Sequence, residues 1–173
     1  MSLSYQVLKS LLSITLSHIA SYLPDLACFH LVLDGFYGHE SYLLLAMENN
    51  LKIISKLKKA ANLKLPYDGQ QKRKGRHRTI GEKINFQEID SKFFVKTIDD
   101  NDRDVETKVY QLNAFTPKMP GKSLNIVVLI HVHKQTKKQA LSILFSNNLT
   151  LTAQEVINYY SLRFQIERTA AAV

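Results

Sequence analysis

The sequence has little cysteine and no long apolar run. Its single cysteine, Cys28, excludes a disulfide within one copy of the chain, so a reducing compartment is the natural one. No stretch reaches the roughly 18 uninterrupted apolar residues that a membrane helix needs. Residues 1–24 lack the basic start and clean apolar core of a signal peptide. These absences predict a soluble, cytoplasmic protein.

Acidic residues are also scarce, with 15 Asp and Glu against 23 Lys and Arg, a net charge of +8. The imbalance is concentrated in residues 52–78, which hold ten basic residues and one acid, Asp68. A nucleic acid is the natural partner of such a segment, because its phosphates attract the cations. The alternative is a solvated basic loop without a partner. The predicted DNA-binding residues are Lys72, Arg73, Lys74, Arg76 and Arg78.

What is present indicates a globular protein: 45% of the residues are hydrophobic and 22% are charged. The spacing of apolar residues predicts a helix over 5–22, a buried strand over 28–35, a helix over 39–50 and a strand over 51–57. The alternation of strand, helix and strand is typical of an α/β layer with parallel pairing.

The middle of the chain changes character. Residues 66–81 are polar, basic and rich in turn residues, which predicts a long exposed loop. Four strand-like segments separated by turn signals follow, over 92–98, 105–115, 124–134 and 140–146. Thr152 and Glu155 form a capping box that begins a final helix. We therefore expect one domain over 1–173, made of an α/β part (1–58), a basic loop with a β-rich insertion (59–150) and a C-terminal helix (151–168).

Asp34 stands where the first apolar strand ends and Gly35 turns the chain. In open α/β sheets, reactive groups collect at the carboxyl ends of the strands, so this carboxylate is a candidate site residue. The alternative is that Asp34 opens a turn or caps the next helix.

Tyr160, Arg163 and Glu167 fall on one stripe of the C-terminal helix, because they are spaced i, i+3 and i+7. This face could hold a divalent metal at Glu167 and a phosphate at Arg163, with Tyr160 as a hydrogen-bonding or stacking group. The alternative places Tyr160 in the core and joins Arg163 to Glu167 in a salt pair worth about 0.3–0.5 kcal/mol.

These three residues match the Y-x-x-R-x-x-x-E signature of insertion-sequence DDE transposases, and the chain resembles that family from about residue 28 to residue 167. The segment "LVLDGFYGHESYLLLA" resembles the surroundings of the family's second aspartate, with Asp34 as its counterpart. The resemblance implies a partial RNase H-like α/β fold with a β-rich insertion. It also implies DNA as partner, at transposon ends and target, and a second transposase copy as a dimer partner.

The family's reaction explains these residue types. Cleaving and joining phosphodiesters uses two Mg²⁺ or Mn²⁺ ions, which carboxylate oxygens bind well. The resemblance makes Asp34 and Glu167 two of the three acidic metal ligands and catalytic residues. It assigns Arg163 and Tyr160 to transposon-end DNA.

Two family positions have no counterpart in the sequence. The first aspartate is missing, since Asp25 is too close to Asp34 and follows a proline, and the lysine expected two turns beyond Glu167 is missing too. We therefore expect a transposase fragment, truncated at both ends, without the opening strands of its sheet and the family's N-terminal DNA-binding region. Metal binding should be weak or absent, and the chain should be inactive alone.

Two other functions stay open. A non-catalytic nucleic-acid-binding protein would use the basic segment alone, and a different metal-dependent nuclease would use Asp34, Glu40 and Glu167. His131 and His133 share one side of a strand and could hold a metal, but no Cys or third His lies near them in sequence. The transposase interpretation requires Asp34 and Glu167 to lie side by side and the Tyr160/Arg163 edge to be open.

Overall fold

The computed structural model describes most of the chain after residue 30. The described residues are 10, 14–15, 18, 30–35, 40–48, 51–117 and 121–170, with the backbone alone for 40–42, 45 and 164–170. The predicted helix over 5–22 therefore lies largely outside the described residues, as does Cys28.

The predicted parallel unit is confirmed. Strand β1 (His30–Val32) and strand β2 (Lys52–Leu57) pair in parallel, and helix α2 (Glu40–Glu48) lies between them in the sequence. Ile53 and Ile54 point to opposite faces of the sheet and are both 0% exposed. A strand buried on both faces needs consecutive apolar residues rather than an alternating pattern, and Ile53 and Ile54 supply them in β2.

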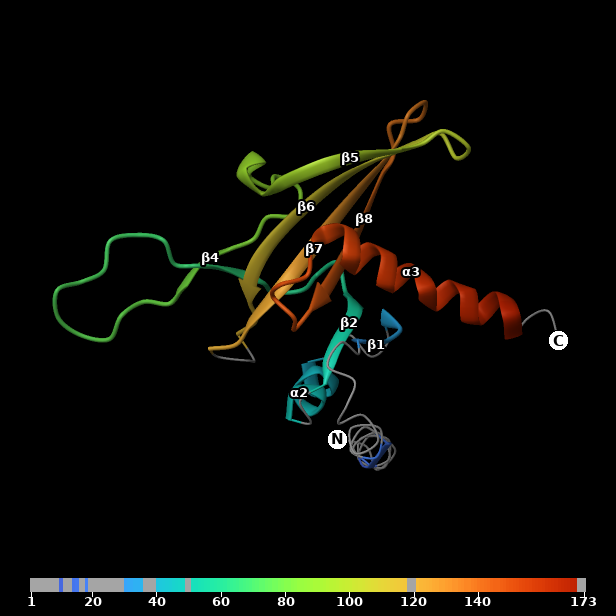
Figure 1. The fold of residues 1–173 in the computed structure, drawn as a ribbon. Helices are drawn as coiled ribbons and strands as arrows, with labels where there is room; N and C mark the ends of the chain where they lie inside the picture. The colour runs from blue at the N-terminus through green and yellow to red at the C-terminus, as the bar shows by residue number, and fades with distance from the viewer. Residues whose placement is uncertain are drawn as a thin grey trace.

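The predicted β-rich insertion is an antiparallel meander (Figure 1). Its strands are β5 (Phe94–Asp100), β6 (Val105–Phe115), β7 (Ser123–His133) and β8 (Gln139–Ser146), and a short 3₁₀ helix, η2 (Ser91–Phe93), precedes β5. Strand β8 also pairs antiparallel with β2, so the meander and the parallel unit form one eight-stranded sheet. The order is β1-β2-β8-β7-β6-β3-β4, with β5 beside β6.

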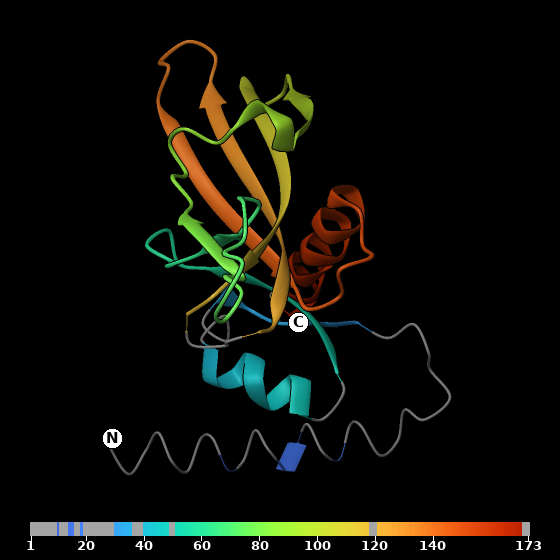
Figure 2. The same ribbon diagram turned by 90° about the vertical axis from the view of Figure 1, so that its left-hand side faces the viewer.

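The two faces of this sheet carry separate cores. Ile126 and Val128 pack on one face together with Leu43 of α2. Val127, which lies between them in β7, packs on the other face with Val156 of helix α3 (Ala153–Ala170). The alternation along β7 therefore places α2 and α3 on opposite sides of the sheet, as Figure 2 shows.

The predicted loop over 66–81 is shorter than expected, because its ends form two strands. Strands β3 (Lys64–Pro66) and β4 (Ile80–Lys83) make a hairpin that joins β6 through Lys64 and Phe115. The buried residues Leu63 and Ile84 flank the hairpin, and the Ile84 amide donates to the Leu63 carbonyl (2.9 Å). The sequence pattern does not predict β3 and β4, because each is flanked by a single buried apolar residue within a basic, polar segment.

Candidate functional site

Helix α3 begins as the capping box predicts. The Thr152 amide donates to Glu155 Oε2 (2.8 Å), and the Glu155 amide donates to Thr152 Oγ1 (3.3 Å). The hydrogen bond from the Thr152 amide, and then the one from its hydroxyl, lower the pKa of Glu155. The capping box therefore fixes where the helix starts on the sheet.

Two amide side chains, one buried and one half-buried, fasten this helix start to the sheet, and sequence reasoning missed them. Asn125 of β7 is 1% exposed and donates from Nδ2 to the Leu151 carbonyl (2.7 Å). Gln111 of β6 donates to the same carbonyl (2.7 Å) and accepts from the Ala153 amide (2.9 Å). A polar residue at a core-facing position of β7 was the available signal, since burial requires such partners.

A third amide side chain, that of Asn147, extends the pairing of β2 with β8. Asn147 Oδ1 accepts from the Ile53 amide (2.8 Å), and Asn147 Nδ2 donates to the Leu51 carbonyl (2.8 Å), so this side chain substitutes for a backbone pair. At the carboxyl end of β1, the Ser55 hydroxyl donates to the Asp34 carbonyl (2.9 Å). The Ser55 hydroxyl therefore anchors the backbone of Asp34 to strand β2.

Asp34 and the C-terminal helix come together although they are far apart in the sequence. Arg163 Nη1 of α3 donates to Asp34 Oδ2 across 129 residues of chain and forms an ion pair with it. The Asp34 side chain is 48% exposed and that of Arg163 is 19% exposed. The edge of β1 and the face of α3 that carries Arg163 therefore form one site.

The stripe on α3 divides into buried and accessible parts. Tyr160 is 8% exposed and packs with Ile54 and Val156, so the expectation of an open edge at Tyr160 is wrong. The Arg163 guanidinium lies 5.5 Å from the centroid of the Tyr160 ring, where a cation is attracted by the ring. Glu167 stands on the same helix, and its side chain lies outside the described residues, as does that of Glu40.

The described residues do not fit a metal centre at this site. Within the described part of the chain, no three His, Cys, Asp or Glu side chains come together to hold a metal ion. The Asp34 carboxylate is paired with a guanidinium, whose positive charge opposes a cation at the same oxygens. His131 and His133 each use Nδ1 for another contact: His131 Nδ1 bonds to Thr107 Oγ1 (2.8 Å), and His133 Nδ1 accepts from the Gln135 and Thr136 amides (3.3 Å each).

The basic loop forms the second candidate site. We call residues 64–83 the basic finger and residues 72–77 its tip. All tip residues are exposed, and they include four of the five predicted DNA contacts, Lys72, Arg73, Lys74 and Arg76. Arg78 differs, because its Nε donates to the Ile80 carbonyl (2.9 Å) and its guanidinium lies over Tyr67 (4.8 Å to the ring centroid).

The comparison with protein families decides the identity. Residues 21–173 match the family model described as a transposase DDE domain. The chain belongs to this transposase family. This confirms the resemblance seen in the sequence although Tyr160 is buried, so membership of the family does not require the open Tyr160 edge that was expected. A mixed α/β structure with a large sheet is compatible with a transposase domain. A comparison with curated proteins gives no match.

Membership of the transposase family indicates the general substrate of the domain. Transposases of this family act on DNA and generally use divalent metals. No helix in the described part of this transposase domain combines the length and apolar character needed to cross a bilayer.

Proposed function

We propose that this transposase domain binds DNA through the tip of its basic finger, while Arg163 holds a phosphate beside Asp34. The observation that carries the proposal is the concentration of exposed cations on one projecting hairpin. Four Lys and Arg in a tip of six residues would release several counterions when they meet a phosphate backbone. Arg163 supports the second contact, because its guanidinium already binds an anionic oxygen and phosphate offers the same fork geometry.

The wider function that we propose is cutting and joining of transposon-end DNA by the transposase to which this domain belongs. The support is the meeting of Asp34 with the helix that carries the Tyr160, Arg163 and Glu167 signature. The metal-ligand roles of Asp34 and Glu167 are carried by the resemblance alone. Since a two-metal site needs several acids and Asp34 is paired with Arg163, we expect the chain to bind DNA without cutting it.

Salt dependence of DNA binding tests the finger. The tip variant combines Lys72→Ala, Arg73→Ala, Lys74→Ala and Arg76→Ala. Each phosphate contact contributes about 0.9 to the slope of log affinity against log salt, so four contacts should lower its magnitude by up to about 3.6. Fluorescence anisotropy with a labelled duplex measures this slope.

A control of equal charge separates a local contact from overall attraction. The control variant combines four exposed basic residues outside residues 52–78, Arg103→Ala, Lys108→Ala, Lys122→Ala and Lys138→Ala. We expect it to bind nearly as the parent chain does. Equal losses in both variants would mean that net charge alone attracts DNA, and the finger would lose its assigned role.

Nicking of supercoiled plasmid tests the catalytic part of the proposal. The isolated chain should leave the plasmid intact with Mg²⁺ or Mn²⁺ present. Cutting that Asp34→Ala abolishes would show a complete metal site in this chain and would overturn the proposal of binding without cleavage.

A further inference from the structure

The base of the basic finger is a two-stranded ribbon, and the loop over residues 67–79 extends from it. Strands β3 and β4 pair at Lys64 with Lys83 and at Pro66 with Ile80, and the Tyr67 amide extends the pairing by donating to the Thr79 carbonyl (3.0 Å). The strands approach so closely at Gly81 that an added Cβ would lie 2.9 Å from the Pro66 carbonyl oxygen. Any larger residue at position 81 would therefore push the ribbon apart.

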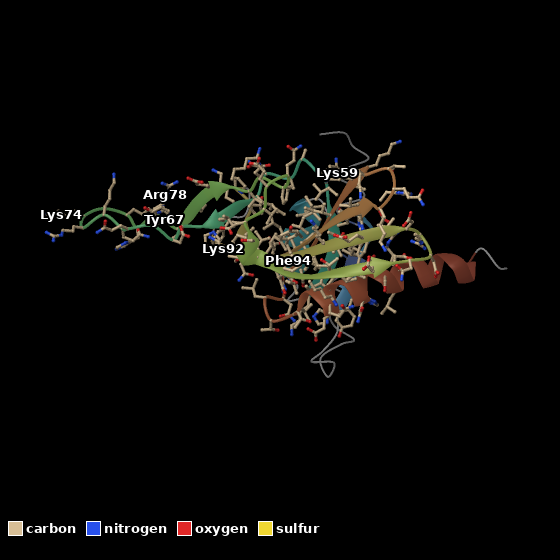
Figure 3. All side chains as sticks on the ribbon, turned by 90° about the horizontal axis from the view of Figure 1, so that it is seen from above. Lys59, Tyr67, Lys74, Arg78, Lys92 and Phe94 are labelled. Atoms are coloured by element: carbon tan, nitrogen blue, oxygen red, sulfur yellow. The ribbon has the colours of Figure 1, made fainter. Side chains whose placement is uncertain are left out.

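A side-chain clasp closes the ribbon below its tip. Gln71 Nε2 donates to the Arg78 carbonyl (2.7 Å), and the Arg78 amide donates to Gln71 Oε1 (2.9 Å), as two paired backbones would do. The Arg78 guanidinium lies over the Tyr67 ring, and the Tyr67 hydroxyl donates to the Gln70 carbonyl (3.0 Å). Figure 3 shows Tyr67 and Arg78 together in the neck of the finger, with Lys74 at its far end. Residues of the finger thus fix its shape, and the tip cations project beyond them.

We infer that the finger enters the major groove of duplex DNA, an inference that rests on the DNA binding proposed above. A two-stranded hairpin fits the major groove, about 12 Å wide, better than the minor groove, about 6 Å wide, which such hairpins enter where the DNA is bent or widened. Arg76 directly follows Gly75, whose φ of +102° turns the chain at the end of the finger, and Arg73 lies two residues before that glycine. From there they reach guanine edges with their forked donors, while Lys72 and Lys74 contact phosphates.

Blocking one groove at a time tests the inference. The probe is a duplex of mixed sequence with an A/T run, and binding is measured by anisotropy at one salt concentration. Cytosines that carry a glucosylated 5-hydroxymethyl group fill the major groove and should weaken binding at least tenfold. Netropsin, which fills the minor groove of the A/T run, should change the affinity less than twofold. Insensitivity to glucosylation would overturn the inference, and so would displacement by netropsin.

The outcomes also separate this inference from the proposal beneath it. If the tip variant loses binding but the parent chain binds the glucosylated duplex normally, the finger contacts DNA outside the major groove. The proposed DNA binding then holds, and only the major-groove inference fails. If the parent chain does not bind the unmodified duplex at all, both fail together.

The clasp gives an independent test at constant charge. Gln71→Ala should weaken binding to the unmodified duplex about three- to tenfold, because the freed finger must be ordered on binding. Gln135→Ala, in the exposed turn between β7 and β8, is the control and should leave binding unchanged. Hydrogen exchange at the Arg78 amide reports whether the clasp has opened. Faster exchange with unchanged affinity would show that a preformed finger is not needed.

Discussion

The ion pair between Asp34 and Arg163 joins the end of strand β1 to helix α3, and its contribution to the free energy of unfolding can be predicted. A double-mutant cycle with Asp34→Asn, Arg163→Met and their combination isolates the pair, because methionine keeps much of the buried stem of Arg163 without its charge. Exposed ion pairs contribute about 0.2–1 kcal/mol. Since the Arg163 side chain is only 19% exposed, we expect the upper end of that range, a coupling of about 1 kcal/mol.

Urea unfolding of the four proteins, followed by circular dichroism, measures this coupling. It should shrink between about 0.1 M and 1 M salt, since the screening length falls from about 10 Å to 3 Å and Asp34 is half exposed. Asp68→Asn in place of Asp34→Asn is the control, because Asp68 lies in the basic finger and should be additive with Arg163→Met. A coupling within the additivity limit of about 0.3–0.5 kcal/mol would refute the idea that this pair joins the helix to the strand.

Two further predictions concern side chains that hold the sheet. Burial, and then the charge of Lys56, lower the pKa of His131 below its ordinary 6.5. The unfolded chain therefore binds the proton more readily, so the native state should lose stability as the pH falls below 6.5 towards the lowered pKa. His131→Gln should flatten this dependence in urea titrations across that range, with His133→Gln as control; parallel curves for His131→Gln and the parent would disprove it. Asn125→Ala should lower the free energy of unfolding by about 1–3 kcal/mol, because it removes the hydrogen bonds of a buried side chain. The control is Asn113→Ala, at the exposed residue paired with Asn125, which should change the free energy of unfolding by no more than about 0.5 kcal/mol.

Much of the fold could be predicted because apolar periodicity reports burial directly. The apolar residues of 51–57 and of 124–134 predicted strands, and the structure has β2 and β7 there. Asp34 and the C-terminal helix were expected to meet because the resemblance implied it. The sequence alone, however, did not predict that Arg163 would be the residue that binds Asp34.

What could not be predicted depends on contacts between distant residues. The position of Asn125 among apolar residues indicates that it needs a buried partner, but the partners of Asn125 and Gln111 at Leu151 and Ala153 are identified only from the folded sheet. Tyr160 was expected at an open edge, because a helical stripe shows which residues share a face but not whether that face is covered. The strands of the basic finger were hidden for a related reason, since Lys64 and Lys83 pair through backbone atoms.

The route by which β2 joins β8 has a consequence for how the domain folds. Ile53 and Asn147 are in contact although 94 residues separate them, whereas β5 through β8 are joined by short turns between antiparallel neighbours. Closing a long segment of chain loses more configurational entropy than closing a hairpin, and contacts of high sequence separation slow folding. We therefore expect the meander to form first and the Asp34 edge to assemble against it later in the folding reaction.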